Sequence, residues 1–452
     1  MNSLARPRFD ANFVLISLFA VFAWAPLTAP GFFLRAHDAS HSAYFLWQFD
    51  ANIQAGVFYP IWAPDWTFGY GYPLFLVIAP LPYYLAELFH LAGLDLIGAI
   101  KAVYLLGFLG SGWAMYLLAR DLFSKGEGGP SLAPGGRGAG LVAATAYIYV
   151  PYHLVDSYVR ADLGEFTAFA FFPLVVFGFR RLVEADDGRD RVTWIAISAL
   201  AYGGLILTHM IAALIFTPLL GSYVLFISLL AGPRPFTREA PPQTDGTNSP
   251  QRTPRAQRFS FILCVLGGEK ILSHLLKIYP MKVPGKEWLL RLIPAGAAAL
   301  LALAASAVYW LPGLVETRYV QSANLVGGFY SYRNHFVYLF QLFSPFWGYG
   351  YAGIGPNDQM PFQVGLVPVV FGLGAAGVFF TNKELRPYLW FFMAAALVYT
   401  LAMLSLAQPL WQAGQRLAVF VQFPWRLLMV VTFAASLMAG AVARLPVSAR
   451  HR

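Results

Sequence analysis

The chain contains very little cysteine and very little charge. Its single cysteine, Cys264, has no partner for an internal disulfide and no second thiolate for a metal site. Only 12% of the 452 residues are charged, whereas a soluble globular protein carries roughly 25%. Together with a mean hydropathy of +0.57, this shortage excludes a fold around one soluble core. It predicts a protein whose main partner is the lipid bilayer.

Several sequence motifs are also missing. The chain has no Walker loop, no Rossmann glycine pattern, no Cys/His zinc spacing and no internal repeat. These absences argue against an ATP-driven pump and a nucleotide-binding enzyme, so we expect no nucleotide cofactor. The net charge of +9 would suit nucleic acid. However, most basic residues fall in predicted cytoplasmic segments, so we expect no nucleic-acid partner.

Long hydrophobic runs are abundant instead. A helical span needs roughly 20 apolar residues. The first run, 11–34, is longer than the apolar region of a signal peptide, so we interpret it as a span. The sequence predicts an all-α, polytopic transmembrane helical bundle of about ten spans. The spans are expected at 12–33, 98–119, 139–153, 165–182, 192–209, 211–231, 291–313, 361–381, 387–406 and 424–443.

The placement of segment 74–94 decides the topology. This segment is apolar, but Pro73, Pro80 and Pro82 interrupt it. We therefore expect a re-entrant or juxtamembrane helix on the outer side rather than a span. Most of the 31 Lys and Arg residues then fall on the cytoplasmic side, in agreement with the positive-inside rule. In this multi-pass topology both termini are cytoplasmic.

The topology divides the chain into three parts. Residues 1–231 form an N-terminal transmembrane module with a long first outer loop at 35–97. Residues 232–290 form a cytoplasmic linker, in which the Pro- and Arg-rich first half predicts disorder and 261–290 an interfacial helix. Residues 291–452 form a C-terminal transmembrane module with an outer loop at 314–360.

The first notable polar stretch follows the first span directly. Asp38 lies between His37 and His41, and a carboxylate next to the hydrocarbon is costly unless it is paired or functional. Asp38 is therefore a candidate general base, with His37 as a second catalytic candidate, or a ligand of a divalent cation with either histidine. The alternative is that Asp38 only caps the helix that follows it.

The same outer loop contains a dense aromatic segment, 59–75, which includes Trp66 and Tyr70. Aromatic rings match the C–H faces of sugars, so these two residues are candidates for substrate stacking. Equally, they are candidates for an interfacial aromatic belt.

A second charged stretch, 151–165, joins two predicted spans. Asp162 and Glu165 are three residues apart and share a helix face, so they can hold a cation or a metal bound to a diphosphate. Arg160 is a candidate substrate ligand. Alternatively, Arg160 and Glu165 form a structural ion pair.

Further polar candidates are dispersed at predicted outer span ends. Arg426 opens the last span and is a candidate phosphate anchor, because guanidinium binds phosphate in a bidentate manner, or it snorkels to lipid headgroups. His209, at the end of another span, is either a buried structural histidine or a substrate ligand. Glu316 and Arg318 follow the span 291–313 and are candidate substrate or phosphate ligands.

With these residues in view, the chain resembles the GT-C superfamily of membrane glycosyltransferases, which includes oligosaccharyltransferases and protein O-mannosyltransferases. The matching pattern is a first span, an acid immediately outside it (Asp38), and a long outer loop with juxtamembrane helices before the second span. The phrases PYHLVDSYVRADLGE, LTHMIAALIF and QFPWR are similar to those of bacterial membrane proteins known as "6-pyruvoyl-tetrahydropterin synthase related".

The resemblance implies transfer of a sugar from a polyprenyl-phosphate donor on the outer face of the bacterial cytoplasmic membrane, in the cell envelope. Asp38 would deprotonate the acceptor, or would hold a metal ion (Mg or Mn) assisted by Asp162 and Glu165. Arg318 or Arg426 would neutralise the leaving phosphate. The acceptor is not identified by the sequence. Two other functions stay open, a transporter or flippase of a lipid-linked saccharide and a non-catalytic membrane scaffold.

Overall fold

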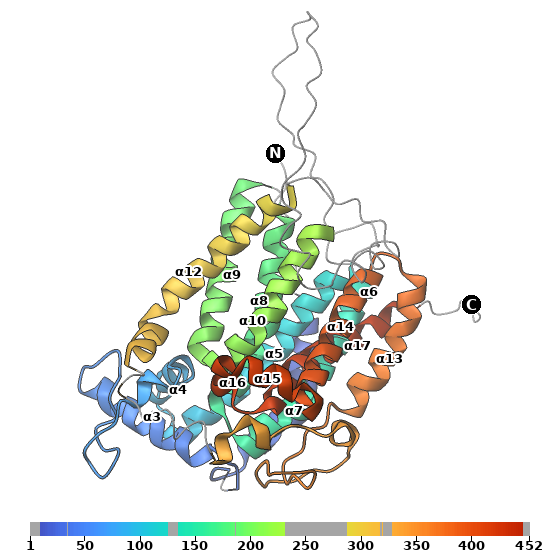
Figure 1. The fold of residues 1–452 in the computed structure, drawn as a ribbon. Coiled ribbons are helices and arrows are strands. Elements are labelled where there is room, and N and C mark those ends of the chain that lie inside the picture. The colour runs from blue at the N-terminus through green and yellow to red at the C-terminus, as the bar shows by residue number, and fades with distance from the viewer. Residues whose placement is uncertain are drawn as a thin grey trace, which may run out of the picture.

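A computed structural model describes residues 10–33, 35–124, 134–185, 187–230, 287–316, 319 and 328–445. Within these ranges the chain forms a bundle of α-helices with no β-strand (Figure 1). Nearly all of the predicted linker at 232–290, and with it the expected interfacial helix, lies outside the described residues. The all-α fold class predicted from the sequence is confirmed for the described part.

Among the described residues, seven helices are long and apolar enough to cross a membrane, as expected of a membrane-embedded protein. They are α5 (Leu96–Phe123), α8 (Leu163–Glu184), α9 (Gly188–Thr208), α10 (Met210–Leu230), most of α12 (Glu287–Glu316), α14 (Arg386–Met403), and the segment Pro424–Arg444 around α17 (Leu428–Ala439).

An eighth candidate span is broken. Helix α6 (Pro134–Tyr149) is followed by α7 (Pro151–Val155) and a π-helical turn, Asp156–Arg160, and the two parts are bent by 42°. The break falls at Pro151, whose backbone nitrogen has no hydrogen to donate. The predicted span 139–153 therefore ends at Tyr149, and the helix axis changes direction at the polar stretch that follows.

The two remaining predicted spans correspond to shorter apolar helices, Asn12–Thr28 and α13 (Leu366–Thr381). The first comprises α1 (Asn12–Phe19), α2 (Val21–Trp24) and a 3₁₀ turn that contains Pro26. At a rise of 1.5 Å per residue, a 16-residue helix covers about 24 Å, less than the roughly 30 Å of hydrocarbon. By length and composition the described chain thus offers seven or eight spans rather than ten.

The loop 35–97, which the sequence predicts to be the first outer loop, contains two helices, α3 (Ala39–Gln54) and α4 (Leu81–Leu91). Helix α4 has 11 residues, so it rises only about 16 Å and is too short to cross a bilayer. This agrees with the prediction that segment 74–94 does not span. Figure 1 shows α3 and α4 at the same end of the bundle as the loop that precedes α13.

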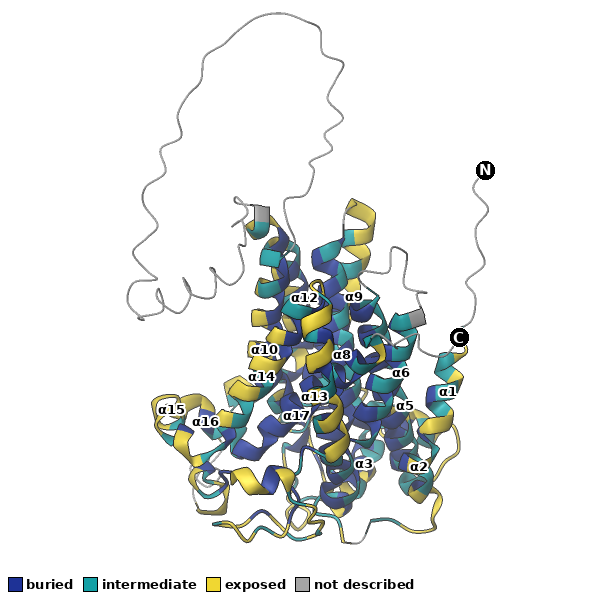
Figure 2. Ribbon diagram, turned by 90° about the vertical axis from the view of Figure 1, so that its right-hand side faces the viewer, coloured by how far each residue is buried: buried dark blue, intermediate teal, exposed yellow. Residues whose placement is uncertain are grey.

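Burial differs strongly between the helices. In the apolar stretch of Pro424–Arg444, 83% of the residues are buried, whereas in that of α12 only 28% are buried. Figure 2 shows the buried residues inside the bundle and exposed ones on outer helices such as α12 and α13. Extended apolar surface on a protein marks contact with a membrane or with another protein, so the exposed outer helices suit contact with lipid, whereas α17 lies in the buried core.

Candidate functional site

Arg160 lies at the centre of a buried group of charged side chains. Its Nη1 atom contacts Asp156 and lies 2.8 Å from Oε1 of Glu165. Its Nη2 atom lies 3.0 Å from Oδ2 of Asp162. The guanidinium also stacks over the Trp425 ring, 4.8 Å from the ring centroid. Because Arg160 is only 3% exposed, these contacts replace the water that its charge would otherwise require.

The backbone around Arg160 is unusual and explains why the carboxylates converge. The π-helical turn Asp156–Arg160 ends at Ala161, which adopts the left-handed conformation with φ 51°. Asp162 then caps α8, because its Oδ1 accepts a hydrogen bond of 2.9 Å from the backbone N–H of Glu165. Turns of this kind and left-handed residues other than glycine recur at functional sites, where the surrounding fold supports their strain.

Arg426 brings the second half of the chain to the same place. Its Nε atom lies 3.3 Å from Oε2 of Glu165, and its Nη1 donates to the carbonyl of Val421 at 3.1 Å. Gln422, four residues before Arg426, has a φ of 60°, a conformation that favours glycine. The guanidinium is held over the ring of Phe423, 5.0 Å from its centroid. The QFPWR phrase thus forms a turn that directs Arg426 at Glu165.

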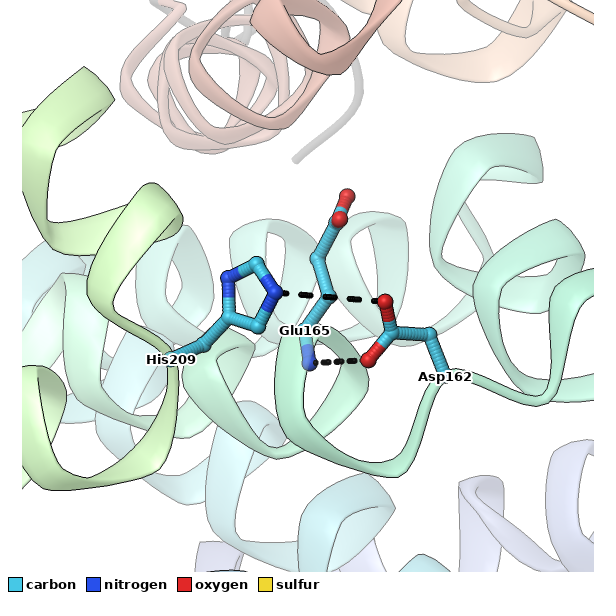
Figure 3. Close-up of side chains that lie close together, drawn as sticks. All are labelled: Asp162, Glu165 and His209. Carbon is cyan, nitrogen blue, oxygen red and sulfur yellow. Dashed lines mark hydrogen bonds and ion pairs between the residues drawn. The ribbon is translucent and has the colours of Figure 1, made fainter. Parts of the chain in front are cut away.

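His209 completes the group. Its Nε2 atom lies 3.9 Å from Oδ2 of Asp162, and Figure 3 shows its ring directed at that carboxylate. Asp162, Glu165 and His209 each offer a ligand atom, and these atoms lie within 4.8 Å of one another, a grouping that can hold a metal ion. We call the whole set the ionic cluster. Its members are Asp156, Arg160, Asp162, Glu165, His209 and Arg426.

The hydrogen bonds of His209 indicate how well the cluster suits a metal. Its Nδ1 accepts the backbone N–H of Ala212 at 3.0 Å, so a neutral ring carries its hydrogen on Nε2, the atom that faces Asp162. Burial lowers the pKa of His209 although Asp162 raises it. Burial alone would raise the pKa of Asp162, but His209 and Arg160 lower it to about 2. A neutral histidine therefore faces an ionised carboxylate.

The carboxylates of the cluster are also occupied. Glu165 is paired with Arg160 and Arg426, and Asp162 with Arg160. A divalent cation would have to compete with two guanidinium groups, and His209 would have to give up its bond to Ala212 to present a lone pair. In this conformation the donor set fits arginine better than it fits Mg²⁺ or Mn²⁺.

Asp38 lies close to this site but in a different environment. Its backbone N–H donates to the carbonyl of Arg160 at 2.7 Å, which fixes the first outer loop to the π-helical turn. Its carboxylate is 44% exposed and lies 3.4 Å from Nδ1 of His41. Asp38 occupies the N-cap position of α3, but its side chain makes no capping hydrogen bond. The Asp38 side chain therefore does not cap α3, and its described ion pair is the exposed contact with His41.

The group of possible metal ligands differs in one member from the predicted set, and the role of Asp38 as a ligand stays a prediction. Among the described residues, the group that can hold a metal contains His209 in place of Asp38. The Asp38 carboxylate is half exposed and lies beside His41. The carboxylates of Asp162 and Glu165 instead contact Arg160.

His37 connects the loop 35–97 with the loop that precedes α13. Its Nε2 lies 3.1 Å from the carbonyl oxygen of Gly350 and 3.3 Å from that of Tyr349, and its ring stacks on Tyr351 with centroids 4.2 Å apart. Burial lowers the pKa of His37, so the neutral ring donates from Nε2. These contacts give His37 a positioning role between the loops, and the catalytic role suggested by the sequence stays a prediction.

Two tyrosines belong to the site although the sequence did not single them out. The hydroxyl of Tyr152 donates to Oε1 of Glu165 at 2.6 Å. Tyr83, on α4, is buried, and burial raises its pKa, with further increases from Asp162 and Asp38. Both carboxylates thus act electrostatically on one tyrosine. The phrase PYHLVDSYVRADLGE offered a signal for Tyr152, but none was available for Tyr83.

Four other candidates lie apart from the ionic cluster or beyond description. Tyr70 is 85% exposed, and the ring of Trp66 packs against Phe45 with centroids 5.4 Å apart. Glu316 ends α12, and no ion pair between described residues joins it to the cluster. Arg318 lies outside the described residues. The sugar-stacking and belt interpretations of the aromatic loop both stay predictions.

Comparison with known proteins adds no residue roles to this geometry. The expected resemblance to GT-C enzymes rests on the loop pattern around Asp38, which assigns no role within the ionic cluster. No protein-family model matches the chain, and no curated protein matches it in sequence.

Proposed function

We propose that this protein is a membrane glycosyltransferase, which moves a sugar from a polyprenyl-phosphate donor to an acceptor hydroxyl at the membrane face with the two long loops. The observation that carries the proposal is that Arg160 and Arg426, from opposite halves of the chain, both lie within ion-pair distance of Glu165. Two convergent guanidinium groups suit a phosphate group. A lipid-linked substrate presents its phosphate at the end of the spanning helices, where these arginines lie.

Arg426 is the member of the cluster most ready to bind phosphate. Its Nε makes no hydrogen bond, and neither does the facing Oε2 of Glu165, although the two atoms form an ion pair. Arg160, by contrast, is shared among three carboxylates. A donor phosphate would therefore displace Glu165 from Arg426 first. Arg426 would then stabilise the negative charge that develops on the leaving phosphate.

Asp38 is the proposed general base. Its carboxylate is accessible, and the backbone bond to Arg160 keeps it beside the ionic cluster. In the reaction, the acceptor oxygen forms a bond to the anomeric carbon while its proton passes to Asp38. The bond from that carbon to the phosphate oxygen breaks, and polyprenyl phosphate leaves with the electron pair. No step is assigned to Mg²⁺ or Mn²⁺, because the carboxylates that would hold either ion are paired with arginine.

The test uses the full chain in vesicles of phosphatidylethanolamine and phosphatidylglycerol, with a radiolabelled polyprenyl-phosphate hexose and membrane extract as the acceptor source. Asp38→Asn should reduce transfer by about 10²-fold or more while donor binding is retained. Arg426→Met should weaken donor binding itself. Asp95→Asn is the matched control, because Asp95 caps α5 through the N–H of Gly98 and lies outside the cluster.

The outcomes separate the competing functions. Full transfer by Asp38→Asn would remove Asp38 from the mechanism. Flux of the labelled lipid across the vesicle without bond cleavage would replace the transferase by a flippase. If the wild type neither binds nor transfers the donor, and Arg426→Met loses much of its stability, the ionic cluster has only a structural role.

A further inference from the structure

An apolar groove of about 490 Å³ lies between α1, α6 and α13. Phe19 of α1 lines one wall, Thr145, Ala146 and Tyr149 of α6 line its floor, and Leu366 of α13 lines the opposite wall. In Figure 2, α6 lies between α1 and α13. The walls are the two shorter apolar helices of the bundle, Asn12–Thr28 and Leu366–Thr381.

The groove contains almost nothing that would hold water. None of its lining residues is charged. The hydroxyl of Tyr149, one of its few polar groups, donates to the backbone carbonyl of Phe19. A buried water needs two to four polar partners, so this space does not suit ordered water. An empty groove of this size would forfeit the packing contacts of every residue along it.

The flanking helices expose large apolar side chains beside the groove. Phe22 is 83% exposed and Leu366 is 78% exposed. Apolar surface of this extent on helices of a membrane bundle faces hydrocarbon. The groove is thus a concave part of the lipid-facing surface, and the material available to fill it is a hydrocarbon chain.

Two of the lining residues, Gly365 and Pro151, lie next to the segment that carries the ionic cluster. Gly365, with φ of 99°, leads into α13, and a Cβ on it would lie 2.5 Å from Cδ of Pro151. Pro151 starts α7, and the next residue, Tyr152, donates to Glu165. Neither Arg160 nor Arg426 lines the groove, so nothing in it recognises a phosphate.

We propose that this groove is a structural lipid site, which retains one acyl chain of a bilayer phospholipid. The chain fills the space between α13 and the α1–α6 pair, and it supports the contact between Gly365 and Pro151 from the membrane side. The site selects its ligand by apolar shape, since it offers no charged contact to a headgroup. This inference does not depend on the enzymatic function proposed for the ionic cluster.

The test uses the full chain in nanodiscs of phosphatidylethanolamine and phosphatidylglycerol that contain a phosphatidylcholine with a diazirine on one acyl chain. After irradiation, mass spectrometry should find adducts concentrated on the groove segments of α6 and α13. The reference is the open apolar face of α12, where Leu300 is 68% exposed. Equal labelling of both regions would mean ordinary bilayer contact and would overturn the proposal.

Groove-filling variants sharpen this result. Thr145→Trp should lower the groove adducts severalfold, and Ala146→Phe serves as a second filling variant if the first does not fold. Leu373→Trp is the matched control, because Leu373 lies on α13, is 72% exposed and does not line the groove. Unchanged labelling in a folded filling variant contradicts the site. So does displacement of the probe by polyprenyl phosphate with no displacement by added phospholipid.

Discussion

The Nε atom of Arg426 lies 3.3 Å from Oε2 of Glu165, and this ion pair joins the last membrane segment to α8. Glu165 is completely buried, and the side chain of Arg426 is 9% exposed. Arg160 approaches the other oxygen of the same carboxylate at 2.8 Å. A single glutamate thus holds two arginines that arrive from distant parts of the chain, and the two halves of the bundle meet at this point.

The coupling between Glu165 and Arg426 is measurable by a double-mutant cycle. Removal of one partner of a buried ion pair leaves an uncompensated charge and costs about 3–5 kcal/mol, so Glu165→Gln and Arg426→Met should each lower the free energy of unfolding by about that amount. The double variant should lose about 0.5–3 kcal/mol less than the sum. Denaturant unfolding in detergent micelles measures all three, with exposed Arg416→Met as control. Strict additivity would show that the pair is not coupled.

Arg160 should not tolerate lysine. Its planar guanidinium serves three carboxylates and the face of Trp425 at once, whereas an ammonium is a compact point charge that cannot reproduce this fork. Arg160→Lys should therefore lower the melting temperature clearly.

The matched control for that variant is Arg181→Lys. Arg181 is paired with Asp121 at 3.3 Å, but its side chain is 41% exposed, and exposed pairs contribute only about 0–1 kcal/mol. Differential scanning fluorimetry in one detergent compares the two variants. Equal melting temperatures for both variants would mean that the buried ion pairs of Arg160 contribute no more to stability than the exposed pair of Arg181.

Much of the fold was readable from hydrophobic runs, and the errors have identifiable causes. The predicted spans 98–119 and 165–182 lie inside α5 and α8, because long apolar runs leave few alternatives, and α8 continues through Pro173. The predicted spans 12–33 and 139–153 extended past the observed helix ends at Thr28 and Tyr149. Pro26 lies in a 3₁₀ turn, and Pro151 follows the break after Tyr149, so proline ended helices that apolar composition alone would continue.

The site was only partly readable. Asp162 and Glu165 are three residues apart, and helical periodicity places them together. The approach of Arg426 to Glu165 depends on how α17 packs against the rest of the bundle, which no local pattern encodes. The same holds for His209, which replaces Asp38 in the group that can hold a metal. Local spacing identifies pairs within one helix, whereas tertiary packing selects their distant partners.

The contact of His37 with the C-terminal outer loop should weaken in acid. Burial lowers the pKa of His37 below the ordinary value of 6.5 for histidine, so the closed loops favour the neutral ring and the open state binds more protons. The contact is therefore most stable above pH 6.5, and its stability falls as the pH drops below that value. Hydrogen exchange around Tyr349–Tyr351, corrected for intrinsic rates, should be faster at about pH 5 than at about pH 7.5.

His37→Gln is the control for this pH dependence, because glutamine keeps a donor for the carbonyl of Gly350 but does not titrate in this range. Its exchange should be the same at both pH values. A wild type without pH dependence, or a variant that retains it, would assign the effect to another group, for which His41 beside Asp38 is the nearest titratable candidate.

Chelation should leave donor binding by the wild-type protein unchanged. Arg160 and Arg426 already compensate the carboxylates that would hold a divalent cation, and the Nε2 of His209 carries a hydrogen while Nδ1 accepts from Ala212. EDTA should have no effect on polyprenyl-phosphate binding, and Mn²⁺ titration followed by electron paramagnetic resonance should show no tight site.

Arg426→Met removes one competing charge from Glu165, so this variant should gain Mn²⁺ affinity. The gain should disappear in Arg426→Met with Asp162→Asn. Tight Mn²⁺ binding by the wild type would instead show that the ion displaces the arginines.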